Sequence, residues 1–313
     1  GDVRDTIEYI MPSLMSIFTT HNNVAEFEPE GPEDVEMAEQ ATNYVNYVFN
    51  RQNNGFKVLY DAFKDALISK TGVIKHYWEE KEEVTTESYT NLTEIEYQSI
   101  LASDELEVVE HTETIIQKAQ VDDMGTLVSP EVITHDVVAK CYKNYGQVKV
   151  ISVPPEEFLV SRRAASLEDA SFVCHRVKKS VSDLIEEGFD PKIVNQIPGY
   201  SQSEAELNEE RLARFSFDDD SVPPSEGDGA TKKVWIDECY MYIDFDGDGV
   251  AELRKITKGG HYILDNEEID MIPFSTICPL PIPHKFHGMS IADTVQDIQL
   301  IKSTIMRNLL DNM

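Results

Sequence analysis

Basic residues are scarce in this sequence. Its 313 residues include 27 Lys and Arg against 58 Asp and Glu, which gives a net charge of −31. Tight nucleic-acid binding needs Lys and Arg to replace the counterions of phosphates, so this balance argues against a dedicated nucleic-acid-binding protein. It does not exclude a surface along which nucleic acid slides without adhering. The same charge is equally typical of a protein that is merely kept soluble.

Cysteines are few, and long apolar runs are missing. The four cysteines (Cys141, Cys174, Cys239 and Cys278) are far apart and form no C-x-x-C pair, which predicts reduced, buried thiols and a cytosolic setting. No run approaches the roughly 20 apolar residues of a membrane helix, so we expect no membrane association. The opening Gly-Asp-Val-Arg lacks the basic and apolar regions of a signal peptide.

Catalytic motifs are also missing. Ser69-Lys70-Thr71-Gly72 lacks the Gly-x-x-x-x-Gly-Lys frame of a phosphate loop, and the segment 288–292 lacks the last glycine of a nucleophile elbow. His284 and His287 have no Cys or acid nearby to complete a metal site, which favours a packing role. We therefore predict that the protein is not an enzyme, and the one cofactor that the sequence suggests is the structural Ca²⁺ considered below.

Helices are predicted at the start of the chain. Apolar residues recur every three or four positions in residues 2–20, after Gly31-Pro32, and between Gly55 and Gly72. Pro12 should kink or restart the first helix, and Gly72 should end the third. Residues 1–72 are therefore predicted to form a helical unit.

The character of the chain then changes to mainly antiparallel strands. Twelve acids and one base between residues 79 and 113 predict an extended hairpin or a flexible acidic flap. Residues 143–146 look like the turn of a hairpin, and residues 199–230 look like a flexible loop. The other strands are expected at 73–80, 171–178, 233–243, 252–257, 261–264 and 274–278, with a short helix at 180–187. Helices, then strands, then a helix predict an α+β fold.

The segment 279–313 ends the chain with a long helix. Prolines at 279, 281 and 283 prevent helix formation before it, and Ser290 with Asp293 forms an N-terminal cap. An apolar stripe follows at helical spacing, made of Ile291, Val295, Ile298, Ile301, Ile305 and Leu309. No stop signal follows, so we expect this helix to continue beyond Met313.

An acidic turn is the sharpest chemical signal. Asp244, Asp246 and Asp248 occupy alternate positions with Gly247 and Gly249 among them and Glu252 after them, as in the calcium loop of an EF-hand, which predicts a structural Ca²⁺ site. The match ends at the twelfth position, which is Lys255 instead of a glutamate. The alternative is a metal-free hairpin turn, because Asp and Gly favour turns by themselves. Both interpretations stay open.

Several blocks of the chain together resemble one known family. They are residues 5–14 (DTIEYIMPSL), 31–34 (GPED), 38–42 (AEQAT), 55–73, 242–254, 281–284 (PIPH), 288–293 (GMSIAD), 297–299 (DIQ), Lys302 and 310–312 (LDN). The chain is thereby similar to the portal proteins of short-tailed (podovirus-type) bacteriophages.

The resemblance implies a structural subunit of a ring of about twelve copies at one capsid vertex. It implies that residues 1–72 are the helical part of the wing, 73–280 its β-rich part, and 281–313 the approach and first stem helix. Double-stranded DNA would pass through the ring without sequence-specific binding during packaging and ejection. The implied partners are terminase, tail or adaptor, scaffold and major capsid proteins. The implied location is the virion, and the host cytoplasm during assembly.

Two other functions compete with the portal interpretation. One is a Ca²⁺-dependent binding or adhesion module built on the segment Asp244–Glu252. The other is an enzyme with an unrecognised site, although no set of residues nominates one.

Overall fold

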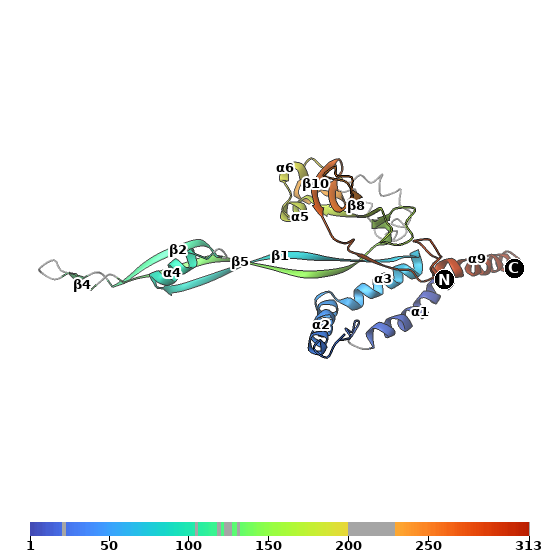
Figure 1. Cartoon of the computed structure of the whole chain (residues 1–313), viewed down its shortest axis with the longest axis horizontal. Helices are drawn as coiled ribbons and strands as arrows, with labels where there is room; N and C mark the ends of the chain where they lie inside the picture. Colours follow the sequence, from blue (N-terminus) through green and yellow to red (C-terminus); the bar gives the residue numbers. More distant parts are fainter. Residues whose placement is uncertain are drawn as a thin grey trace. The chain divides into compact units, whose positions relative to one another are not determined.

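The computed structural model describes residues 1–20, 23–103, 106–117, 120–121, 127–129, 132–199 and 229–312. The contacts within the chain divide it into two compact units. The first comprises Gly1–Tyr77 and Val150–Met313, and the second comprises Trp78–Lys149 (Figure 1). The flexible loop predicted at 199–230 lies outside the described residues except at its ends.

The predicted N-terminal helices are confirmed. They are α1 (Asp2–Thr19), α2 (Val35–Tyr47), which continues into the π-helical turn η1 (Val48–Gln52), and α3 (Gly55–Ser69). The apolar faces of α1 and α3 pack together, with Phe18 and Phe63 at 5.2 Å between ring centroids. The buried residues of this cluster are Ile7, Met11, Met15, Leu59, Phe63 and Leu67.

Two details of these helices differ from the prediction. Helix α1 is continuous from Asp2 to Thr19 and does not restart at Pro12, and Met11 and Met15 near the proline are buried in the core. Helix α3 ends at Ser69, and the capping residue Lys70 adopts a left-handed φ of 76°. Gly72 instead begins β1 (Gly72–Leu92), where a Cβ atom would lie 2.1 Å from the carbonyl oxygen of Ala62.

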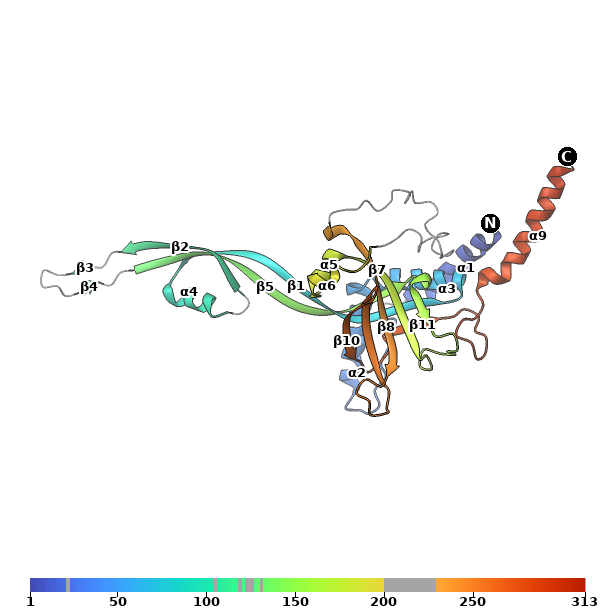
Figure 2. The same cartoon turned by 90° about the horizontal axis from the view of Figure 1, so that it is seen from above.

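A five-stranded antiparallel sheet forms most of the rest of the first unit (Figure 2). Its strand order is β10-β9-β8-β7-β6, with β10 at Tyr262–Glu268, β9 at Glu252–Gly259, β8 at Lys233–Ile243, β7 at Phe172–Ser180 and β6 at Phe158–Val160. One apolar cluster joins this sheet to Val73 of β1 and Phe274 of β11 (Phe274–Ile277). Another lies under the short helices α5 (Val181–Glu186) and α6 (Pro191–Val194). The 3₁₀ turns η2 (Pro155–Glu157) and η3 (Gly229–Thr231) precede β6 and β8.

The second unit is built on two long strands. The acidic stretch 79–113, predicted as an extended hairpin or a flexible flap, lies mainly in two strands and a helix among its described residues, and both strands pair with β5 instead of with each other. Strand β1 continues to Leu92, α4 spans Glu94–Leu101, and β2 spans Leu106–Gln117. Strand β5 runs from Val132 to Val153 beside β1 and β2. Alternate residues of β5 from His135 to Cys141 are buried, so one face of this sheet packs in a core and the acidic strands are ordered against it. The short strands β3 (Gln120–Val121) and β4 (Leu127–Ser129) pair with each other.

The hairpin turn predicted at 143–146 is also wrong, because these residues lie inside β5. Gly146 does not serve a turn. A Cβ atom there would lie 2.0 Å from the indole of Trp78, so the glycine makes room for that ring. Glycine inside a strand often marks such a close approach instead of a turn.

Every strand pairing whose register is described is antiparallel, and the fold is α+β as predicted. The chain ends in the long helix α9 (Ile291–Asp311), also as predicted.

Candidate functional site: the C-terminal helix and two charged clusters

Helix α9 begins with the cap that the sequence predicts. The Asp293 backbone N–H donates to Ser290 Oγ at 2.9 Å, and the Ser290 backbone N–H donates back to Asp293 Oδ2 at 3.0 Å. These two bonds form a capping box. The hydrogen bonds with the Ser290 backbone and side chain, and after them the Lys70 ammonium at 3.6 Å, hold the pKa of Asp293 below its usual value. Ser290 is fully buried and serves as a cap, so it is not placed as a nucleophile.

The first half of α9 is attached to α1 and α3. Ile291 packs against the α1–α3 core. The Val3 backbone N–H donates to Gln299 Oε1 at 3.2 Å, and the Lys302 ammonium donates to Asp2 Oδ1 at 2.8 Å. Nothing described in the chain covers the helix beyond this point, and all its residues from Ile301 to Asn312 are exposed.

The exposed part of α9 carries the predicted apolar stripe. Ile298, Ile301, Ile305 and Leu309 are 54%, 60%, 54% and 58% exposed. Three further large apolar side chains of this helix are exposed as well, namely Met306, Leu300 and Leu310. Full burial of one such side chain is worth about 1.5–3 kcal/mol. An apolar patch of this kind is typical of a surface that packs against another protein.

The predicted calcium ligands divide into two sets. The carboxylates of Asp244, Asp246 and Asp248 each offer an oxygen within 4.8 Å of the other two, and all three residues are exposed. Each also accepts backbone N–H bonds inside the turn. Gly247 and Gly249 donate to Asp244 at 2.7 and 3.0 Å. The turn is thus closed by its own hydrogen bonds, as in the metal-free alternative.

Glu252 does not join the three aspartates in the described part of the chain. It lies opposite Ile243 in the pairing of β8 with β9, and its carboxylate is 3.6 Å from Arg254 Nη1. The guanidinium of Arg254 in turn lies over the Phe245 ring, 4.3 Å from its centroid. The calcium site therefore stays a prediction that involves the three aspartates, without Glu252 in the described arrangement.

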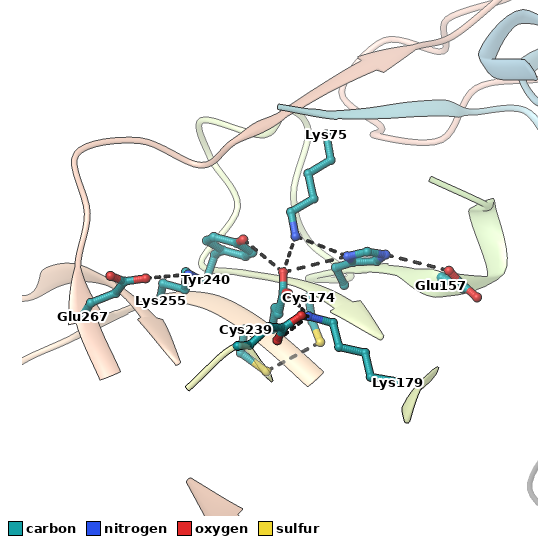
Figure 3. Close-up of polar contacts among 11 residues, drawn as sticks. Lys75, Glu157, Cys174, Lys179, Cys239, Tyr240, Lys255 and Glu267 are labelled. Atoms are coloured by element: carbon teal, nitrogen blue, oxygen red, sulfur yellow. Dashed lines mark hydrogen bonds and ion pairs between the residues drawn. The ribbon is translucent and has the colours of Figure 1, made fainter. Parts of the chain in front are cut away.

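A buried ion network lies inside the first unit (Figure 3). The Lys75 ammonium of β1 donates to Glu238 Oε2 of β8, and the two side chains are 7% and 12% exposed. His175 of β7 stands opposite Glu238 in the sheet and has its Nδ1 atom 3.4 Å from Lys75 Nζ. The Tyr240 hydroxyl donates to Glu238 at 3.5 Å, and Glu157 lies 3.8 Å from His175 Nε2.

Burial and pairing act in opposite directions on the pKa values of this network. Burial lowers the pKa of Lys75, and the charge of Glu238 compensates only in part. For Glu238, burial raises the pKa, but the bonds with His175 and Lys75 outweigh it and the carboxylate stays ionised. For His175, burial lowers the pKa, but the bonds with Glu157 and Glu238 outweigh it and the net shift is upward. The partners of each buried charge offset the free-energy cost of removing that charge from water.

The two histidines before α9, His284 and His287, have structural roles. His287 Nδ1 lies 2.9 Å from the Thr71 hydroxyl, so this histidine joins the approach to α9 with the start of β1. His284 has a positive φ of 63° in the turn between the prolines and α9. Neither belongs to a group of metal-ligating side chains among the described residues.

Sequence reasoning missed the ion network entirely. Lys75, His175 and Glu238 are separated by 163 positions at most in the chain, and no local pattern connects them. The only signal was weak: Lys75, His175 and Glu238 each lie beside apolar residues in a predicted strand, where a buried charge requires a partner.

The exposed apolar face of α9 is typical of a protein that packs against another protein. The chain belongs to the phage portal family described as Phage SU10 portal protein, whose match extends over residues 1–313. It is therefore a structural component of a bacteriophage virion, and its family is one of oligomeric rings that associate with the capsid and DNA. Among curated proteins, none matches this chain. No helix in the described residues is both long and apolar enough to cross a membrane.

Proposed function

We propose that this protein is one subunit of the portal ring that forms the DNA conduit at a capsid vertex, used in genome packaging and ejection. The observation that supports it best is the exposed apolar stripe of α9. In a ring, each subunit contacts one neighbour through one surface and the other neighbour through a different surface. The exposed apolar face of α9 would therefore pack against a neighbouring subunit. On this proposal α9 is the first stem helix, and residues 1–280 form most of the wing.

The ring would contain about twelve copies, by the resemblance stated above. Terminase, tail or adaptor, scaffold and major capsid proteins would be its partners, with assembly in the host cytoplasm. The net charge of −31 supports passage of DNA without sequence-specific binding, because acidic walls repel phosphates. Asp297 is exposed on α9 and is available for that purpose, whereas Asp293 is engaged in the cap.

The test is ring formation by the full-length protein, observed by electron microscopy and native mass spectrometry. We expect closed rings of about twelve copies with a central hole. Ile301→Lys combined with Ile305→Lys should prevent closure, because it places two ammonium groups in an apolar interface at a cost of several kcal/mol. Ser303→Lys, on the same exposed turns of α9, is the matched control and should still form rings.

Two results would contradict the proposal. One is a full-length protein that stays monomeric at every concentration and salt tested. The other is ring formation by the Ile301/Ile305 double variant as efficient as that of the control, which would place the subunit interface elsewhere. Unchanged packaging after Asp297→Asn would remove the role of α9 acids in DNA passage and leave the ring itself untouched.

A further inference from the structure

Two histidines and a glutamate come together in the second unit, far in sequence from the acidic turn. His111 and Glu113 are two residues apart on β2, so they share one face of the strand. Glu113 stands directly opposite His135 of β5 in the antiparallel register, which puts His135 on that face as well. One ligand atom from each of the three side chains lies within 4.8 Å of the other two.

The two histidines face each other at nearly the separation of metal ligands. His111 Nε2 is 2.9 Å from His135 Nδ1. Two nitrogens bound at about 2.0–2.1 Å in a tetrahedral zinc site stand roughly 3.3 Å apart. A movement of a few tenths of an ångström therefore suffices to admit an ion between these rings. Glu113 supplies a carboxylate from the solvent side of the cluster, because it is exposed.

A second carboxylate orients His135. Its Nε2–H group donates to Glu94 Oε2 at 2.8 Å, and the histidine side chain is 3% exposed. This bond assigns the proton of the neutral ring to Nε2, so the lone pair is on Nδ1, the atom that faces His111. Histidine ligands of metals almost always have such a partner on the other ring nitrogen, since it fixes the tautomer and raises the basicity of the ligand.

Helix α4 covers the cluster and supplies this partner. Tyr97 of α4 stacks on His111 at 4.3 Å with an interplanar angle of 6°, and on His135 at 4.7 Å with an angle of 14°. The aromatic ring therefore restricts both imidazoles to one orientation. The start of α4 is itself fixed, because Thr93 and Glu96 form a capping box. Preorganised ligands with an ordered surrounding are what a metal site requires.

We propose that His111 Nε2, His135 Nδ1 and the Glu113 carboxylate bind one divalent transition-metal ion of the Zn²⁺ class. Imidazole nitrogens with a carboxylate suit such ions, whereas Ca²⁺ and Mg²⁺ take oxygen ligands. Water completes the coordination. In the metal-free cluster the His111 Nε2–H group donates to His135 Nδ1; on binding, the His111 proton moves from Nε2 to Nδ1, so that both facing nitrogens offer lone pairs.

The bound ion ties β2 to β5 beneath α4. Its role is structural, because an ion that binds only the folded unit stabilises it by mass action. The ion is distinct from the calcium predicted at the turn Asp244–Asp248, which uses oxygen ligands alone and lies in the other unit.

The test is Zn²⁺ binding to the full-length protein after removal of metals with a chelator. Calorimetry at neutral pH should detect one ion per chain, and native mass spectrometry should confirm the count. His111→Gln retains an N–H donor toward His135 but removes the ligand, and we expect an affinity loss of at least about 100-fold. Glu94→Gln, which removes only the partner of His135, should reduce the affinity by about 10- to 100-fold. Tetrahedral Co²⁺ absorption bands that vanish in His111→Gln would provide a readout independent of stability.

Two control variants match these changes. His261→Ala removes an exposed histidine from the turn between β9 and β10, and Glu268→Gln removes an exposed carboxylate at the end of β10; both should bind Zn²⁺ as the wild type does. Equal urea unfolding of wild type and His111→Gln in chelator would show that the variant folds. The proposal is overturned if Zn²⁺ at about 100 μM does not bind to the wild type. It is also overturned if His111→Gln binds Zn²⁺ with the affinity of the wild type.

Discussion

Glu238 is the most consequential single residue of the buried network. Replacing it by Gln keeps the shape of the side chain but removes the charge that faces Lys75. The ammonium is then left in a buried site, with His175 Nδ1 at 3.4 Å as its remaining close neighbour within the network. Breaking a buried pair from one side costs about 3–5 kcal/mol, because the other charge stays desolvated.

The cost of deprotonating Lys75 sets an upper limit on this loss of stability, and the limit has the same size. Lys75 can avoid being a buried unpaired charge by losing its proton. The free energy of that deprotonation is set by the difference between its ordinary pKa of 10.5 and pH 7. At 1.36 kcal/mol per pH unit, that cost is about 4.8 kcal/mol. We therefore expect Glu238→Gln to lower the free energy of unfolding of the first unit by about 3–5 kcal/mol at pH 7.

Urea unfolding measures this loss, with Trp235 of β8 as the fluorescent probe in a Trp78→Phe background. A local probe is needed because a chain with two units need not unfold in one step. The matched control is Glu267→Gln, whose partner Lys255 pairs with it at the surface, with 31% and 48% of the two side chains exposed. That pair should contribute only about 0–1 kcal/mol.

The loss should also depend on pH in a defined direction. In Glu238→Gln, the pKa of Lys75 lies below its unfolded value, so the unfolded chain binds more protons and stability rises as the pH approaches 10.5. Combining Lys75→Met with Glu238→Gln should restore most of the loss, because no unpaired buried charge remains. Equal losses for Glu238→Gln and Glu267→Gln, or a loss that stays constant from pH 7 to 10, would refute the reasoning.

Three further predictions concern other parts of the chain. Gly72→Ala should destabilise the first unit by roughly 1–3 kcal/mol in the same urea assay, because the new Cβ overlaps the Ala62 carbonyl; a loss near zero would contradict the close packing of α3 on β1. A calcium ion at the acidic turn predicts a higher melting temperature in Ca²⁺ than in chelator, and no such difference in Asp246→Asn; equal temperatures for the wild type would favour the metal-free turn. The raised pKa of His175 predicts stabilisation that is complete below pH 6.5 and is lost as the pH rises through the folded-state value, so the pH profile of His175→Gln should be flatter; coincident profiles would remove the charged histidine from the network.

Elements whose signals are local could be predicted from the amino-acid sequence alone. The Ser290–Asp293 cap, the apolar stripe of α9 and the Asp/Gly turn at 244–249 all involve residues a few positions apart, and each is found where it was predicted. The portal family was also readable from blocks of the sequence, and the match over residues 1–313 confirms it. Such features are local because a cap or a tight turn is made by hydrogen bonds between near neighbours in the chain.

Features that depend on strand register could be recognised only in the folded chain. Gly146 was predicted to be a turn residue, but it lies inside β5, where the absence of a side chain leaves room for the Trp78 ring of the neighbouring strand. Glu113 and His135 become neighbours because β2 pairs with β5 in one register, and a slip of a single residue would turn His135 to the opposite face. Lys75 meets Glu238 across 163 positions for the same kind of reason. Pairings between distant strands are set by the core that they bury together, and no short segment of the sequence contains that information.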